Sequence, residues 1–134
     1  MRYLSASDLR DLLPPAALIA AIKQSLCDFA LGKVIVPVRQ HVESGGRTLL
    51  TMPVIAEPAF GAKIVSVVPG NAERNLPVTS GLMVLSDGLT GQPLAVLNAA
   101  ALTAQRTGAV GALGLSCMTP AGVDRIGVIG TGVQ

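Results

Sequence analysis

The sequence contains few aromatic residues and little charge. Of its 134 residues none is tryptophan, one is tyrosine and two are phenylalanine, and 13% are charged while 50% are hydrophobic. The core is therefore expected to be aliphatic and rich in alanine. The length suits one domain with a substantial core, since domains most often contain about 100–150 residues.

Several classes of function are disfavoured by what is missing. Ten basic and eight acidic residues give a net charge of +2 without any basic run, so no nucleic-acid partner is expected. His41 is the only histidine, and it has no second histidine or cysteine pair nearby to form a metal site or a Cys/His dyad. The sequence also has no Gly-x-Ser-x-Gly elbow and no Walker loop.

The two cysteines indicate the redox state of the compartment in which the protein is found. Cys27 and Cys117 are far apart and show no zinc-binding spacing, which favours two buried free thiols in a reducing compartment. Charged residues at 8–11 interrupt the apolar stretch that a secretory signal needs, so we expect a cytoplasmic protein. Residues 107–123 are uncharged but short for a membrane span and contain several glycines, which predicts a buried helix.

Helical patterns occupy both ends of the chain. Ser5 or Ser7 is expected to cap a helix through about Leu13, and Pro15 begins a second helix that Gly32 ends. A third helix is predicted from Ala99 to about Met118. Its glycines, spaced three apart, suggest close packing against another element. These glycines are Gly108, Gly111 and Gly114.

Strand patterns fill the middle of the chain. Short apolar or β-branched runs are bounded by turn residues, and Ser44-Gly45-Gly46 is a hairpin signal. The predicted strands are 34–43, 47–53, 62–68, 82–86 and 93–97.

The last residues carry a possible nucleotide-binding signal. A short apolar strand is predicted at 126–129, followed by Gly130-Thr131-Gly132. In a dinucleotide-binding turn the first glycine permits the bend and the second lets the backbone approach a pyrophosphate. A glycine turn after an ordinary strand has the same local sequence. On the first interpretation 1–122 is one domain, 123–134 begins an incomplete second one, and the chain is the front part of a larger enzyme.

Six motifs, in order along the chain, carry a resemblance to a known family. They are Gly-Ala-Lys-Ile-Val at 61–65, Pro-Gly-Asn at 69–71, Leu-Pro-Val-Thr-Ser-Gly at 76–81, Thr-Gly-Gln-Pro-Leu-Ala at 90–95, Ala-Leu-Thr-Ala-Gln-Arg-Thr at 101–107 and Ile-Gly-Thr-Gly at 129–132. Together they resemble the ornithine cyclodeaminase/mu-crystallin family. The resemblance covers nearly the whole chain but less than half of a typical member.

The resemblance implies an α+β fold, in which an N-terminal substrate-binding and dimerisation domain with a mixed sheet and helices precedes a Rossmann domain for NAD or NADP. Family members interconvert amino acids and imines by hydride transfer, as in ornithine cyclodeaminase or reductases of pyrroline-2-carboxylate and other ketimines. All these substrates have a carboxylate beside the reacting carbon. A homodimer is implied, although an incomplete fold also exposes apolar surface and favours aggregation.

The resemblance also implies roles for individual residues. Arg39, Lys63 and Arg106 match the cations that hold the carboxylate. From the residues alone, a surface arginine, an extended lysine and a structural ion pair explain them equally well, although a charge within the uncharged stretch around Arg106 favours a partner. The residues implied to contact the cofactor are Arg106, Thr107, Gly130, Gly132, Val133, Gln134 and Thr79.

The sequence departs from the family pattern at three places. Val78 stands where members commonly carry a cofactor-contacting threonine, and Thr79 is one place further along, where a strand side chain points to the opposite face. Leu50 stands where ornithine-processing members have a glutamate for the distal amine, which favours a ketimine or pyrroline carboxylate substrate. The catalytic aspartate of the family falls beyond Gln134. A non-catalytic binding or dimerisation module and a decayed gene product remain alternatives.

Overall fold

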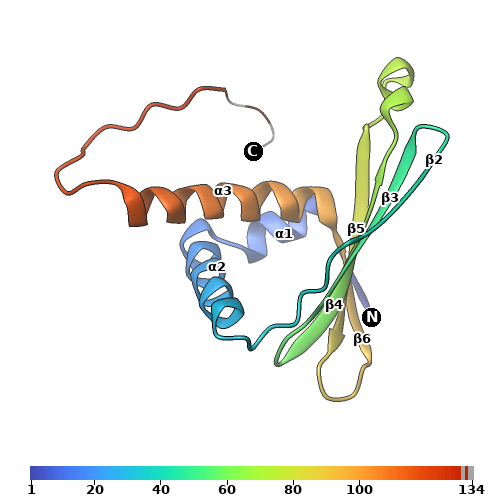
Figure 1. Cartoon of the computed structure of the whole chain (residues 1–134), viewed down its shortest axis with the longest axis horizontal. Coiled ribbons are helices and arrows are strands. Elements are labelled where there is room, and N and C mark those ends of the chain that lie inside the picture. The colour runs from blue at the N-terminus through green and yellow to red at the C-terminus, as the bar shows by residue number, and fades with distance from the viewer. Residues whose placement is uncertain (131, 133–134) are drawn as a thin grey trace.

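The computed structural model describes residues 1–130 and 132. Ten elements follow one another along the chain, and Figure 1 shows the sheet to one side of the helices. They are β1 (Arg2–Leu4), α1 (Ala6–Leu12), α2 (Pro15–Ala30), β2 (Gln40–Ser44), β3 (Arg47–Ile55), β4 (Ala59–Val67), the 3-10 helix η1 (Pro69–Arg74), β5 (Thr79–Asp87), β6 (Pro93–Asn98) and α3 (Ala99–Met118).

The six strands form one mixed sheet in the order β1-β6-β5-β4-β3-β2. β1 runs parallel to β6, and every other neighbouring pair is antiparallel. The predicted α+β fold with a mixed sheet is confirmed. The hairpin of β2 and β3 turns at Gly45 and Gly46, whose φ angles of 57° and 69° suit a tight hairpin turn, which requires positive φ at both central positions.

The strand predicted at 34–43 forms only at its end. β2 begins at Gln40, and the residues before it contribute a single bridge between Ile35 and Ile55. Pro37 lies in this stretch, and a proline cannot donate a ladder hydrogen bond. The segment therefore crosses from α2 to the sheet as a connection.

Local sequence explains where the helices begin. Ser5 caps α1 in a capping box with Asp8, and the hydrogen bonds from Ser5 hold the pKa of the Asp8 carboxyl below its ordinary value. Pro15 opens α2, because a proline at the first helical position gives up no hydrogen bond. Asn98 caps α3 by accepting the N–H of Ala101 at 2.9 Å.

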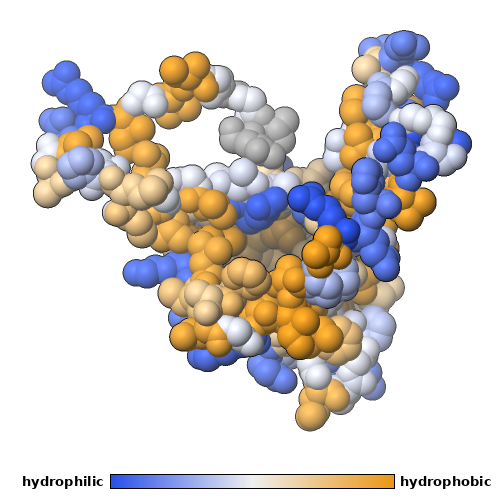
Figure 2. All heavy atoms as spheres, in the orientation of Figure 1, coloured by the Kyte–Doolittle hydropathy of each residue, from blue (hydrophilic) through white to orange (hydrophobic). Residues whose placement is uncertain are grey.

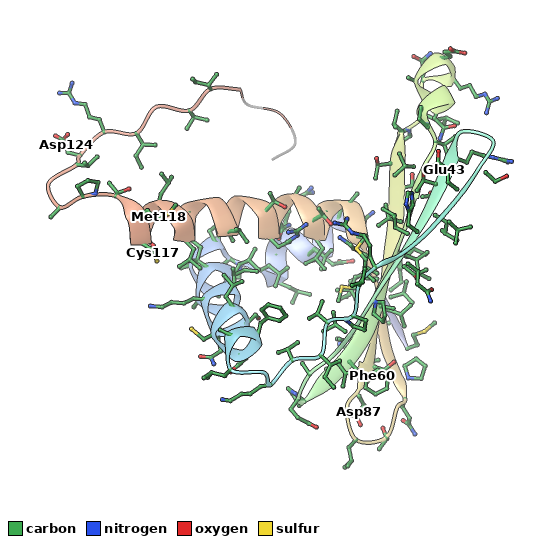
Figure 3. The ribbon with its side chains drawn as sticks, viewed as in Figure 1. Glu43, Phe60, Asp87, Cys117, Met118 and Asp124 are labelled. Atoms are coloured by element: carbon green, nitrogen blue, oxygen red, sulfur yellow. The ribbon has the colours of Figure 1, made fainter. Side chains whose placement is uncertain are left out.

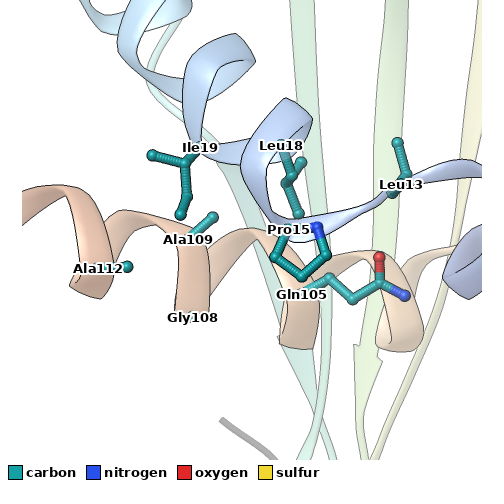
Figure 4. A pocket seen from close by; sticks show the side chains of 8 residues that line it. All are labelled: Leu13, Pro15, Leu18, Ile19, Gln105, Gly108, Ala109 and Ala112. Atoms are coloured by element: carbon teal, nitrogen blue, oxygen red, sulfur yellow. The ribbon is translucent and has the colours of Figure 1, made fainter.

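The helices meet beside the sheet and bury a small core. α2 packs across α3, with Leu18 and Ile19 over Ala109 (Figure 4). The buried apolar residues are Leu9, Leu18, Ala95, Ala99 and Ala109. The core is aliphatic and alanine-rich, as the composition predicts.

Much apolar surface stays exposed. The solvent-accessible area is 9687 Å² for 13.6 kDa, whereas a compact monomer of this mass exposes roughly 6,600 Å². The excess of about 3,000 Å² resembles the surface that an obligate interface covers. The substantial core expected from the length is therefore not formed within this chain.

Three predictions about burial are wrong. Cys27 and Cys117 are free thiols but exposed, and Figure 3 shows Cys117 and Met118 at the end of α3 farthest from the sheet. The second half of α3 is largely exposed, because α2 crosses its middle and no described element covers the rest. A Cβ at Gly108 or Gly111 would have nothing within 4 Å among the described atoms, so these glycines are not close-packed.

The strand predicted at 126–129 does not form. Residues 123–130 have no regular structure, and Ile129 is fully exposed. Asp124 marks this segment in Figure 3, beyond the end of α3. A strand needs neighbours for its N–H and C=O groups, and none of the described strands lies beside it.

Within residues 1–130 and 132, no single helix has the length and apolar composition of a membrane span, although α1 and α2, bent by 85°, meet that test as a pair.

Candidate functional site

A cavity of about 540 Å³ lies between the middle of the sheet and the start of α3. Side chains alternate between the two faces of a strand, so Lys63, Val65 and Val67 of β4 share one face. Register places Met52 opposite Lys63 and Leu50 opposite Val65. The lining residues are Leu50, Met52, Lys63, Val65, Val67, Thr79, Ser80, Gly81, Ala99, Ala100, Thr103 and Ala104.

Lys63 is the one cation among these lining residues, and the charges of Arg39 and Arg106 act on it. Burial lowers the pKa of Lys63, and the positive charges of Arg106 and Arg39 lower it further. Arg39 comes from the segment before β2 and Arg106 from α3, so the chain brings together the three residues that the family motif predicts. Figure 2 shows strongly hydrophilic residues along the edge of an apolar hollow between helices and sheet.

This cationic cluster, defined as Arg39, Lys63 and Arg106, has no acidic partner among the described residues. The ion pairs found there join Lys33 to Asp28 at 3.5 Å and His41 to Glu43 at 3.9 Å. Mutually repelling cations beside a partly desolvated cavity are costly without a counter-ion. The arrangement therefore suits an anionic ligand, and arginine suits a carboxylate through its planar fork.

Arg106 does not have the environment that its sequence suggests. The uncharged stretch around it favours a buried charge with a structural partner, yet Arg106 is exposed. The reason is that α3 is covered on the side that faces α2, and Arg106 lies outside that contact. The structural ion pair is absent from the described residues, so Arg106 is free to meet a ligand.

Thr79 lies on the cavity side of the sheet. It pairs with Val67, two residues along β4 from Val65, and therefore shares the face of Lys63. Strand alternation predicts that Thr79 faces away from Val78, but β5 begins only at Thr79, so Val78 lies outside the strand. Only the register of β5 against β4 shows that the side of the sheet carrying Thr79 is the side that lines the cavity.

The remaining predicted cofactor residues are placed as follows. Thr107 Oγ1 is buried and has no hydrogen-bond partner among the described atoms. Gly130 has a φ of +86°, the left-handed conformation that glycine adopts readily. Gly130 and Gly132 do not line the cavity, and Val133 and Gln134 lie outside the described residues.

Sequence reasoning missed several lining residues. Met52, Val65 and Val67 follow from strand alternation and register once Lys63 is placed. Thr103 lies one helical turn before Thr107, so the i, i+4 rule would have found it. Ser80, Ala99 and Ala100 carry no such signal, because they line the cavity only where β5 and the start of α3 meet.

The fold and this cavity define a small α+β domain with a site suited to an anionic ligand, and comparison with known proteins gives its family. The sequence profile of the ornithine cyclodeaminase/mu-crystallin family matches residues 3–134. The chain belongs to that family.

Relatives of known activity agree with this assignment. Delta(1)-pyrroline-2-carboxylate reductase 2 of Burkholderia ambifaria is 36% identical over 130 residues, covering 96% of this chain and 42% of the relative. A reductase of the same name from Thermococcus litoralis, solved with NADH and L-proline, superimposes with a TM-score of 0.76 at 34% identity, over 83% of this chain and 36% of its own.

An archaeal alanine dehydrogenase dimer with bound NAD gives a TM-score of 0.78 at 32% identity, over 83% of this chain and 35% of its own. The chain thus spans about 42% of the length of the curated relatives that it matches.

Proposed function

We propose that this chain forms the substrate-binding part of an NAD(P)-dependent reductase acting on pyrroline-2-carboxylate or a similar ketimine carboxylate. The observation that carries the proposal is the cationic cluster of Arg39, Lys63 and Arg106, which has no acidic partner among the described residues. Relatives named as pyrroline-2-carboxylate reductases support it.

The cluster orients the substrate through its carboxylate. Two guanidinium groups and one ammonium neutralise that charge and fix the adjacent carbon, and positioning of this kind can supply several kcal/mol of a reaction barrier. When bound, the nicotinamide cofactor supplies the hydride.

The apolar side chains beside Lys63 on the sheet select the rest of the substrate. Leu50, Met52 and Val65 are apolar and line the same cavity. They exclude water and offer no counter-ion to a distal ammonium, which would lose its hydration on entry. This favours a cyclic or aliphatic imine carboxylate over ornithine.

Two features of the chain fit the cofactor. The buried Thr107 hydroxyl lacks a partner among the described atoms, as expected of a group that a ligand completes. Gly130 already has the positive φ that a tight phosphate-binding turn uses. Arg106, Thr107, Gly130 and Gly132, with Val133 and Gln134 from the sequence, would hold it.

A homodimer is part of the proposal. The sheet face away from the cavity exposes Val42, Leu49, Ile64 and Leu82, each more than 40% accessible. A second copy covering this face would remove much of the excess apolar area. Light scattering should show a dimer that Ile64→Asp dissociates, and a stable monomer across concentrations would contradict this part.

The enzymatic proposal is tested by extending the chain after Gln134 with the nucleotide domain of a relative. The chimaera should oxidise NADH or NADPH when given pyrroline-2-carboxylate, and much more slowly with other substrates such as an imine lacking the carboxylate. A folded chimaera that binds both ligands without turnover would favour the non-catalytic module instead.

A further inference from the structure

Helix α3 has two opposite faces, one in contact with α2 and one lining the cavity. Gln105, Gly108 and Ala109 lie on the face that meets α2 (Figure 4). Ala99, Ala100, Thr103 and Ala104 lie on the cavity face, as the 3.6-residue period requires. Of these four lining residues, Thr103 is the one with a polar side chain.

The hydroxyl of Thr103 is not used by its own helix. A serine or threonine inside a helix commonly donates to a carbonyl one turn back, and Ser25 donates to Ala21 O at 2.8 Å while Ser116 donates to Leu113 O at 2.8 Å. Within the described part of the chain Thr103 makes no such bond, although it is only partly exposed. Its hydrogen-bonding capacity is therefore available to a ligand.

The charges around the cavity cannot meet every need of an imine carboxylate. Lys63, Arg39 and Arg106 are donors only, so they suit the carboxylate and repel a protonated ring nitrogen. The ring N–H needs an acceptor, and the described lining contains no carboxylate. The lining residues that carry a hydroxyl are Thr79, Ser80 and Thr103.

Geometry distinguishes these hydroxyls. Ser80 pairs with Ser66 on β4 and is directed to the other face of the sheet by strand alternation. Thr79 pairs with Val67, four residues along β4 from Lys63 and so about 13 Å away. Thr103 comes from α3, three residues and so just under one turn before Arg106 on the same helix.

We propose that Thr103 is a substrate-binding residue whose hydroxyl accepts a hydrogen bond from the ring N–H of the ligand, while the cationic cluster holds the carboxylate. This inference rests on the proposed function, because it deepens the recognition at the same cavity. Thr103 sets which face and edge of the ring are presented. The cluster alone cannot set this, since it contacts only one end of the molecule.

Two planar aromatic acids distinguish binding of the carboxylate from binding of the ring N–H. Pyrrole-2-carboxylate has a ring N–H beside its carboxylate, and furan-2-carboxylate has a ring oxygen there without a proton. Both can be titrated into the chain by NMR. The chain should bind the pyrrole acid more tightly by roughly threefold to tenfold, the range of a neutral hydrogen bond.

The variant Thr103→Val keeps the shape of the side chain and removes the hydroxyl. It should abolish the preference for the pyrrole acid and leave the affinity for the furan acid nearly unchanged, and Thr103→Ser should restore the preference. Thr119→Val is the matched control, because Thr119 ends α3 outside the cavity. It should keep the preference intact.

The outcomes distinguish this inference from the proposed function. If Thr103→Val retains the preference while Lys63→Met weakens both acids, Thr103 is not the acceptor and the carboxylate site stands. If the wild-type chain binds neither acid, both the carboxylate site and the role of Thr103 are refuted. Amide spectra of each variant identify any loss of fold, and Thr103→Ser then decides whether the hydroxyl is used.

Discussion

Replacing Lys63 by methionine should weaken ligand binding and strengthen the fold at the same time. Lys63 is half-buried on β4, and its pKa is lowered by desolvation and by the charges of Arg106 and Arg39. Methionine has a similar length and no charge. It would remove the burial cost and the repulsion, and its thioether would remain beside Met52, Lys63's partner in the register.

The size of the binding effect follows from the contact that is lost. A hydrogen bond to a charged group contributes about 1.5–3 kcal/mol, and each 1.4 kcal/mol is a factor of ten in affinity. Because the site is partly open to solvent, we expect the lower part of this range. Binding of pyrrole-2-carboxylate should fall roughly tenfold in NMR titrations, while the thermal unfolding midpoint rises.

The pH dependence of binding gives an independent check. The ammonium form of Lys63 binds the carboxylate, and its pKa lies below the ordinary 10.5. The wild-type affinity should therefore begin to fall at a lower pH than for an ordinary lysine, and Lys63→Met should lose this step. The free energy of unfolding should also rise as the pH goes from the lowered pKa of Lys63 towards 10.5. In that range the unfolded chain binds more protons than the folded chain, so the cost of burying a charged Lys63 disappears.

The control is Lys23→Met, which removes an exposed lysine of α2. It should change neither the affinity nor the pH profile. Unchanged binding in Lys63→Met, or a lowered unfolding midpoint with a native amide spectrum, would refute the reasoning that Lys63 is a desolvated cation held in place for an anion.

Three further predictions concern other parts of the chain. In the chimaera extended after Gln134, Arg106→Leu should lower kcat/KM at least roughly tenfold, whereas Arg125→Leu should do much less; the reverse order in steady-state assays would overturn the site. Gln105→Leu should raise the unfolding free energy by about 1 kcal/mol in urea titrations, because Gln105 Oε1 is buried without a partner among the described atoms. Ser5→Ala should cost about 1 kcal/mol, and it should remove the part of the stability that wild type loses as the pH falls through the lowered pKa of Asp8; equal acid sensitivity of both proteins would argue against the capping box.

Local sequence was sufficient where a few neighbouring residues decide the structure. The hairpin at Gly45 and Gly46, the start of α2 at Pro15 and the bounds of α3 were all predicted, because turns and caps depend on backbone preferences within a few residues. The family motif also pointed to Arg39, Lys63 and Arg106, whose charges act on one another in the structure, and their role in binding a carboxylate stays a prediction.

Tertiary structure decided what lies inside and what faces the cavity. The thiols of Cys27 and Cys117 and the side chain of Arg106 were predicted in buried surroundings, yet they are exposed. Apolar composition cannot tell which surfaces meet within one chain. The strand predicted at 126–129 failed for a related reason, since a strand exists only beside a partner.

The sequence by itself determined most of the helices and strands and the residue types that could hold a carboxylate. The sheet register alone decided that Thr79 shares a face with Lys63, and the way α3 meets the sheet decided that Thr103 joins them. The physical reason is that hydrogen-bonding preferences act between neighbours in the chain, while a binding site depends on side chains from distant segments that share one face only after strands and helix have packed.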